Sequence, residues 1–187
     1  MWGTNLKWPG EFRVSVKSVI ILAAHGAPPK DFPKDKLAEF FGLHFRLETM
    51  AGPGRAAMEK RFRELDREMR QWPRTAENDP FFGATMELAR LLGQKTGREV
   101  EVGFNEFCRP DLDEAFAKAV EGGAERITVV TPMMTPGGEH AEEDIPAAIR
   151  RARERAPAVL VDYLWPPDQA EVAGFLAAQI RRAGLDG

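Results

Sequence analysis

The sequence has a single cysteine, Cys108, among 187 residues. A disulfide framework is therefore impossible within one chain, and so is a structural zinc or iron–sulfur site built only from cysteine. Long apolar runs are also missing, because the longest, residues 19–24, is far shorter than the roughly 18 residues that span a bilayer. The first nine residues lack the apolar segment of a signal peptide. These absences favour a cytoplasmic protein with no membrane partner.

An excess of positive charge is absent as well. The 26 basic and 29 acidic residues are interspersed and give a net charge of -3. Proteins that bind nucleic acid usually present a basic face, so the composition argues against that partner. No Gly-x-Gly-x-x-Gly or Gly-Lys-Ser/Thr motif occurs, which disfavours a nucleotide cofactor. The nucleophile elbow Gly-x-Ser-x-Gly is missing too, and Cys108, with no defined base beside it, is expected to be a packing residue.

Short apolar segments alternate with stretches of helical periodicity. Strands are expected over residues 14–24, 99–107, 126–132 and 159–164, and helices over 81–97, 111–122, 140–155 and from Asp168 onward. This alternation is typical of right-handed βαβ units. It predicts one α/β domain, residues 1–187, with a doubly wound, mostly parallel four-stranded sheet flanked by helices. The residues of the last helix expected to face the core are Val172, Phe175, Leu176, Gln179 and Ile180.

The least regular part is an insert of about residues 28–80 after the first strand. A short helix is expected over residues 34–41, and an amphipathic helix over 55–72 with an apolar stripe from Met58 to Trp72. Such a stripe is typical of a helix that packs on the sheet or on a partner subunit, and a lid over a ligand cleft is the alternative. His44 lies between Leu43 and Phe45 and is interpreted as structural.

Residues with metal-ligand or acid–base chemistry follow three successive strands. His25 follows the first, Glu106 lies near the end of the second, and Glu139 and His140 follow the third. The carboxyl ends of strands in a doubly wound sheet share one rim, so we expect two imidazoles and a carboxylate to meet there. Imidazole and carboxylate bind divalent cobalt, nickel, iron and zinc, and both groups can accept protons. The pattern therefore predicts an open metal site with bases beside it.

Each of these residues also has an ordinary structural interpretation. A histidine at a strand end is often a hydrogen-bonded loop residue, Glu106 has a candidate partner in Arg109, and acids in a first helical turn are favourable partners of the helix dipole. Their shared position at three strand ends favours a functional site. The backbone N–H groups of Gly137 and Gly138 are suited to binding a carboxylate of a ligand.

Three segments carry a resemblance to a known family. They are Ile-Ile-Leu-Ala-Ala-His-Gly over 20–26, Val-Glu-Val-Gly-Phe-Asn-Glu-Phe over 100–107, and Gly-Glu-His-Ala-Glu-Glu-Asp-Ile-Pro over 138–146. Together they resemble the sirohydrochlorin chelatases, the short, ATP-independent cobalt, nickel or iron chelatases of the class II chelatase superfamily. The most specific motif matches at Gly138, His140, Asp144, Ile145 and Pro146. The position of the insert is similar to that of an extension in protoporphyrin ferrochelatases.

The resemblance implies a chelatase-like fold and insertion of a divalent metal into sirohydrochlorin or a related tetrapyrrole. It implies that His25 and His140 bind the metal and accept pyrrole protons, with Glu106 assisting. Gly138, Glu139 and Arg109 are then candidates for contact with the tetrapyrrole. Arg109 is the cation among them, and a polycarboxylate ring favours cations at the rim of its site. The first motif departs from the family's pattern, because Ala27 stands where a serine or threonine is usual.

Two other functions are compatible with the same residues. One is a non-catalytic tetrapyrrole or metal carrier that keeps the site without turnover. The other is a structural or regulatory subunit that pairs with another chain through the apolar stripe of residues 58–72. The sequence leaves open which metal is used, because sites of histidine and glutamate follow metal availability. It also leaves open whether a homodimer forms.

Overall fold

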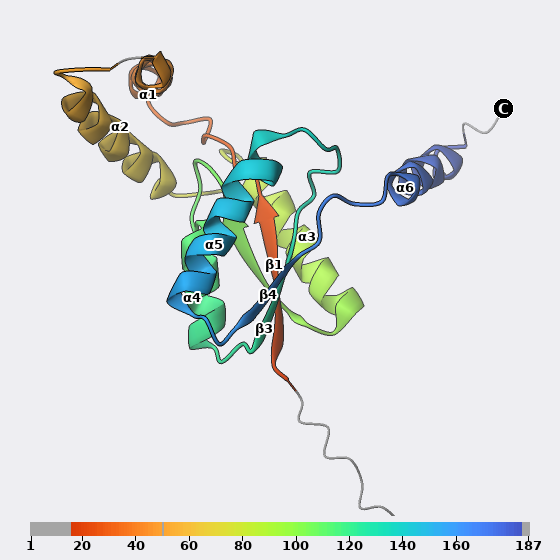
Figure 1. Ribbon diagram of the computed structural model, residues 1–187. Coiled ribbons are helices and arrows are strands. Elements are labelled where there is room, and N and C mark those ends of the chain that lie inside the picture. The colour runs from red at the N-terminus through yellow and green to blue at the C-terminus, as the bar shows by residue number, and fades with distance from the viewer. Residues whose placement is uncertain (1–15, 50, 185–187) are drawn as a thin grey trace, which may run out of the picture.

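Four parallel strands form one sheet in the computed structural model, which describes residues 16–49 and 51–184. They are β1 (Ser18–Ala24), β2 (Glu99–Phe104), β3 (Arg126–Val130) and β4 (Leu160–Tyr163), in the order β2-β1-β3-β4. The helices are α1 (Lys34–Thr49), α2 (Arg55–Arg70), α3 (Pro80–Thr96), α4 (Leu112–Glu121), the π-helix η1 (His140–Asp144), α5 (Ile145–Arg155) and α6 (Gln169–Arg182). Helices α4 and α5 cover one face of the sheet and α3 covers part of the other (Figure 1). The predicted fold class is confirmed.

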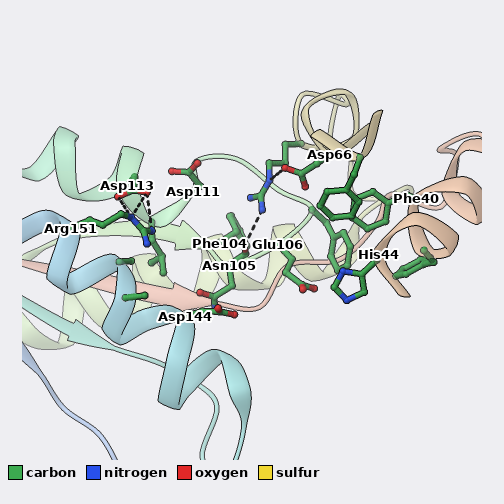
Figure 2. A pocket seen from close by; sticks show the side chains of 17 residues that line it. Phe40, His44, Asp66, Phe104, Asn105, Glu106, Asp111, Asp113, Asp144 and Arg151 are labelled. Carbon is green, nitrogen blue, oxygen red and sulfur yellow. Dashed lines mark hydrogen bonds and ion pairs between the residues drawn. The ribbon is translucent and has the colours of Figure 1, made fainter. Parts of the chain in front are cut away.

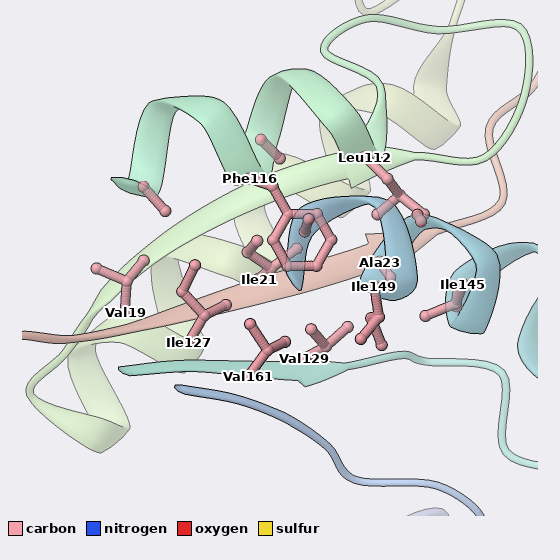
Figure 3. Packing of buried hydrophobic residues seen from close by; sticks show 14 of the residues in the cluster. Val19, Ile21, Ala23, Leu112, Phe116, Ile127, Val129, Ile145, Ile149 and Val161 are labelled. Carbon is pink, nitrogen blue, oxygen red and sulfur yellow. The ribbon is translucent and has the colours of Figure 1, made fainter. Parts of the chain in front are cut away.

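Side chains of β1 alternate between two buried clusters. Val19, Ile21 and Ala23 pack against α4 and α5, together with residues of β3 and β4 (Figure 3). Leu22 and Ala24 point to the opposite face, toward α3 and the insert. Because successive side chains of a strand point to opposite faces, a strand buried on both faces must be apolar throughout, as β1 is.

Local signals fix several helix ends. The Asp111 side chain accepts a hydrogen bond from the backbone N–H of Glu114, whose own carboxylate accepts from the N–H of Asp111, so α4 begins with a capping box. Asp79 caps α3 by accepting from the N–H of Phe82, and Gly97 ends that helix with a φ of 66°. These ends agree with the sequence prediction to within a residue or two.

Two element lengths predicted from the sequence are wrong. Helix α1 runs to Thr49 rather than ending near 41, because Leu43 is buried against α2 and ion pairs such as Arg61–Glu39 join the two helices. Strand β2 ends at Phe104 rather than at 107. The chain turns there into a tight loop in which Phe107 has a φ of 59°, a conformation that cannot continue a strand.

The prediction that α6 packs its apolar residues on the core is also wrong. None of its residues is buried, and Phe175, Leu176 and Ile180 are each about half exposed. Helix α6 stands apart from the sheet in Figure 1. The segment between β4 and α6 carries Pro166 and Pro167, which fix the backbone, and it leads the helix away from β4.

The first predicted strand begins too early: residues 16 and 17 precede β1, which begins at Ser18, and residues 14 and 15 lie outside the described residues. None of the helices in residues 16–49 and 51–184 has the length and apolar character that crossing a membrane demands.

Candidate metal centre

The topology places one end of the sheet at the centre of the candidate site. From β1 the chain moves to β2 on one side and then returns to β3 on the other, so the order of strands reverses between β1 and β3. Open α/β sheets bind ligands at the carboxyl ends of the strands beside such a reversal. His25 directly follows β1, His140 begins η1 in the segment after β3, and Glu106 lies two residues beyond β2.

The structure brings these three predicted residues together. One ligand atom from each of His25, Glu106 and His140 lies within 4.8 Å of the others. His25 Nδ1 is 4.0 Å from one Glu106 carboxylate oxygen, and His140 Nε2 is 3.8 Å from the other. Atoms that bind one ion at about 2.1 Å lie roughly 3–4 Å apart, so a small closure would let the three share a divalent metal. Three protein ligands leave coordination positions open.

Asp144 orients His140 within this group. Its carboxylate oxygen lies 2.6 Å from His140 Nδ1, which leaves Nε2 free on the side of Glu106. A carboxylate bound to the second nitrogen is the usual partner of a metal-ligating histidine, since it fixes the ring and raises its basicity. The sequence interpretation gave Asp144 only as a motif match and a helix-dipole partner. The signal that would have found this pair is its i, i+4 spacing.

Gly26 lets the loops that carry His25 and Glu106 approach each other. Its φ is 104°, and a Cβ atom added there would lie 1.9 Å from the Glu106 carbonyl oxygen. Two backbone hydrogen bonds of 2.9 Å join the loops, from Asn105 N–H to the Ala24 carbonyl and from Glu106 N–H to the His25 carbonyl. The glycine after His25 therefore determines where Glu106 lies.

The structure shows the remaining predicted residues, Gly138, Glu139 and Arg109, in three different settings. The Gly138 carbonyl accepts hydrogen bonds from the N–H groups of Ala141 and Glu142 and so opens η1. Glu139 is exposed at the N-terminus of η1. Arg109 pairs with Glu114, which lowers the pKa of that carboxyl. The alternative in which Arg109 is the partner of Glu106 is therefore wrong.

Cys108 is buried two residues after Glu106. Burial raises the pKa of its thiol, and the sulfur lies 3.6 Å from the Ala27 carbonyl oxygen. A neutral, enclosed thiol is a poor nucleophile and a poor metal ligand, so Cys108 packs rather than reacts.

A cavity of about 370 Å³ opens beside Glu106 (Figure 2). Its wall on one side consists of aromatic residues of the insert and of the Glu106 loop: Phe40, Phe41, His44, Phe62 and Phe107. Asp144 and Arg151 lie on the opposite wall. His44, interpreted from the sequence as structural, stacks on Phe62 and also lines this cavity. The insert thus forms part of the wall of a cleft. The apolar stripe of α2 is packed, as the main expectation had it, because Leu65 and Met69 are buried in the cluster that contains Leu22 and Phe104 of the sheet.

Phe107 connects the aromatic wall to His25, one of the candidate metal ligands. Its ring stacks on the imidazole of His25, with the ring centroids 6.3 Å apart. It makes edge contacts with Phe40 and Phe41, at centroid distances of 6.0 and 6.2 Å. The side-chain amide of Asn105 also lines the cavity, and both of its polar atoms are buried without a hydrogen-bond partner among the described residues. A buried amide costs free energy until a ligand or water satisfies it. Sequence reasoning singled out neither residue, because only the folded loop aims them here.

The comparisons with known proteins concern the family and the fold. The model of the CbiX family matches residues 80–183, more than half of the chain. The chain belongs to the CbiX family. The resemblance to the sirohydrochlorin chelatases is thereby confirmed at the level of family. The matched part contains Glu106 and His140, whereas His25 and most of the insert lie outside it.

Curated relatives of this CbiX-family chain include a sirohydrochlorin ferrochelatase of Priestia megaterium, 34% identical over 108 residues, which are 56% of this chain and 40% of the relative. A sirohydrochlorin cobaltochelatase of Methanopyrus kandleri is 49% identical over 47 residues, 25% of this chain and 32% of the relative. The matches thus span well under half the length of these relatives. A solved structure of a putative cobalamin biosynthesis CbiX protein from Marinobacter aquaeolei has a TM-score of 0.53 at 18% identity, over 90% of this chain and 98% of that one, and so shows a shared fold.

Proposed function

We propose that this CbiX-family chain inserts a divalent metal, cobalt, nickel or iron, into sirohydrochlorin or a related tetrapyrrole without a nucleotide. One observation carries the proposal: ligand atoms of His25, Glu106 and His140 lie within 4.8 Å of one another beside an aromatic cavity. The names of the relatives support the substrate, since they are sirohydrochlorin ferrochelatases and cobaltochelatases. The sheet and the insert would act as one unit in this reaction.

Metal insertion needs two kinds of chemistry. The metal must exchange bound water for protein ligands, and two pyrrole N–H protons must leave the ring as its nitrogens bind the metal. Two imidazoles and a carboxylate hold the ion with open positions for incoming nitrogens. As ring nitrogens replace protein ligands, each released ligand becomes a base that takes one of the two protons. Asp144, 2.6 Å from His140, stabilises the imidazolium that forms there.

The cavity walls suit a flat ring. Phe41 and Phe107 offer aromatic surface, which binds planar conjugated ligands through stacked or edge contacts. The cations of the walls, Arg70 and Arg151, are each paired with an acid, Asp66 and Asp113 respectively. Ring carboxylates would therefore compete with these acids for the arginines.

The direct test mixes purified protein with sirohydrochlorin and cobalt, nickel or ferrous iron and follows the metallated spectrum. We expect a rate above the spontaneous one that does not depend on ATP. The chain contains three histidines, and His44 lies outside the group of His25, Glu106 and His140, so His44→Ala is a control for metal binding, measured by titration with Co²⁺, in His25→Ala and His140→Ala. Loss of metal binding in the last two variants and its retention in His44→Ala support the proposal. Full activity of His140→Ala, or no acceleration at all by the wild type, contradicts it.

The same experiment distinguishes the proposed enzyme from a non-catalytic carrier. His25 retains 45% of its side-chain exposure and Glu106 34%, which suits an ion that exchanges readily. A carrier would bind one metal per site through the same histidines and yet leave the insertion rate unchanged. A structural subunit would bind no metal in a histidine-dependent way.

A further inference from the structure

Asn105 carries a buried amide whose hydrogen bonds are not made within the described part of the chain. It lies between Phe104, which ends β2, and Glu106, and it lines the aromatic cavity (Figure 2). Its side-chain oxygen and nitrogen are both buried, and neither has a partner in residues 16–49 and 51–184. Burying polar groups in this way costs free energy, and native proteins keep few such groups. Because the amide lies on a cavity wall, a ligand in the cavity can supply the missing partners.

The backbone of Asn105, by contrast, is held on both sides. Its N–H donates to the Ala24 carbonyl at 2.9 Å, and its carbonyl accepts from the Arg70 guanidinium at 3.0 Å. These two bonds fix the residue between β1 and α2. A ligand would therefore meet the amide in place, without first paying to order the loop.

Asn78, the other asparagine of the described residues, shows how this chain satisfies a buried amide. Its side-chain nitrogen donates to Asp31 at 3.0 Å and to the Pro73 carbonyl at 2.8 Å. Its side-chain oxygen accepts from the N–H of Thr75 at 2.8 Å. Asn78 is 8% exposed and holds the turn before α3 together. The amide of Asn105 holds nothing together in this way.

Neither arginine of the cavity wall is free to receive a carboxylate of a ligand. Arg70 donates to Asp66 and to two backbone carbonyls, and Arg151 is paired with Asp113 at 2.9 Å (Figure 2). No lysine lines the cavity, and three further acids do: Glu106, Asp111 and Asp144. A carboxylate that entered would lose its water without gaining a free cation, which is costly.

We propose that Asn105 recognises an uncharged amide side chain of the tetrapyrrole, so that the preferred ring carries a carboxamide in place of at least one carboxylate. An amide both donates and accepts, so a ligand carboxamide can form two reciprocal hydrogen bonds with Asn105. An ionised carboxylate only accepts, and it would leave the Asn105 oxygen without a partner. The inference rests on the proposed function and names the ring side chain that this site selects.

Absorbance titration with metal-free rings tests the selection separately from turnover. The two probes are sirohydrochlorin and sirohydrochlorin whose acetate side chains have been converted to carboxamides. We expect the wild type to bind the amidated ring roughly tenfold more tightly, the order of effect that one or two hydrogen bonds supply. Asn105→Leu has a similar volume and no hydrogen-bonding group, so it should bind the two rings equally.

Thermal unfolding without ligand distinguishes recognition from a structural role. Asn105→Leu removes two buried polar atoms that lack partners, so its melting temperature should rise by about 2–4 °C. Asn78→Leu is the matched control and should lower the melting temperature, because it leaves Asp31 and the Pro73 carbonyl without their donor. A fall in both variants would show that Asn105 has a structural role and would overturn the inference.

The binding results separate this inference from the proposed function. Metal insertion into either ring above the spontaneous rate supports the proposed function, whatever Asn105 does. Equal affinity of the wild type for the two rings, or a preference that persists in Asn105→Leu, overturns the inference alone. Absence of binding to both rings overturns the inference and the proposed function together.

Discussion

At the scale of single residues, we expect the contact between Asp144 and His140 to determine how firmly the proposed site holds a metal. Asp144→Asn keeps the shape of the side chain and removes the negative charge 2.6 Å from His140 Nδ1. We expect metal affinity to fall by about 10- to 100-fold, because outer-shell partners of metal-binding histidines have effects of that order. Titration calorimetry with Co²⁺ measures it. Glu143→Gln removes a charge from the same turn and should leave the affinity nearly unchanged; equal losses in both variants would contradict the orienting role.

Gly26 carries the second prediction at this scale. Gly26→Ala should lower the melting temperature and weaken metal binding, because the new Cβ would lie 1.9 Å from the Glu106 carbonyl oxygen and force that loop away. Gly52→Ala is the matched control: its φ is 106° against 104° for Gly26, but nothing lies within 4 Å of its added Cβ. The Gly52→Ala variant therefore has only the backbone strain of an alanine at positive φ and no steric clash. Similar metal affinity in the two alanine variants would show that the close approach is unimportant.

The convergence of His25, Glu106 and His140 could be predicted from the sequence, whereas the surroundings of these three residues could not. His25, Glu106 and His140 each follow a strand, and parallel strands bring their carboxyl ends to one rim whatever the loops do. Asn105 and Phe107 depend on a loop with a positive φ, and His44 depends on how the insert folds back over the cavity. Such placements come from contacts distant in the sequence, which periodicity does not encode.

At the scale of elements, Tyr163 of β4 holds η1 in place. Its hydroxyl donates to the Ala141 carbonyl at 2.9 Å, one residue from His140. Burial, with a smaller contribution from the charge of Glu142, raises the pKa of Tyr163 to about 12. An unfolded tyrosine titrates near pH 10, so the folded state favours the neutral phenol. Its contribution to stability is therefore complete below about pH 10 and is lost as the pH rises toward 12.

This titration can be observed directly, because Tyr163 is the single tyrosine of the chain. The ultraviolet absorbance of tyrosinate should appear with a midpoint of about pH 12 in the folded protein and near pH 10 in denaturant. Urea unfolding at rising alkaline pH should show stability falling over the same interval, and Tyr163→Phe should reduce that fall. A folded-state midpoint near pH 10 would contradict the buried environment.

The elements also differ in how far the sequence predicts them. Helices with an aspartate cap, such as α4 after Asp111, carry their signals locally and were predicted nearly to the residue, whereas the strands were found in the right places but came out shorter than predicted. The length of α1 depends on packing against α2. The direction of α6 depends on how its linker is attached, so an amphipathic pattern alone wrongly placed it on the core.

At the scale of the whole molecule, one buried ion pair joins the insert to both loops of the candidate site. Arg74 donates to Asp79 at 2.7 Å, to the Ala27 carbonyl at 2.9 Å, and to the carbonyls of Met69 and Phe107. The Arg74 and Asp79 side chains are 7% and 1% exposed. The arginine therefore links the His25 loop, the Glu106 loop and the end of α2 at a single point.

Arg74→Met should lower the free energy of unfolding by about 3–5 kcal/mol, because it leaves the Asp79 carboxylate buried without its partner. The exposed pair Arg61–Glu39 provides the control within the insert: Arg61→Met should cost no more than about 1 kcal/mol. Urea denaturation of both variants measures the difference. Because the same arginine binds both loops, Arg74→Met should also weaken Co²⁺ binding while Arg61→Met does not. Equal stability of the two variants would mean that the insert is held to the sheet by its apolar contacts alone.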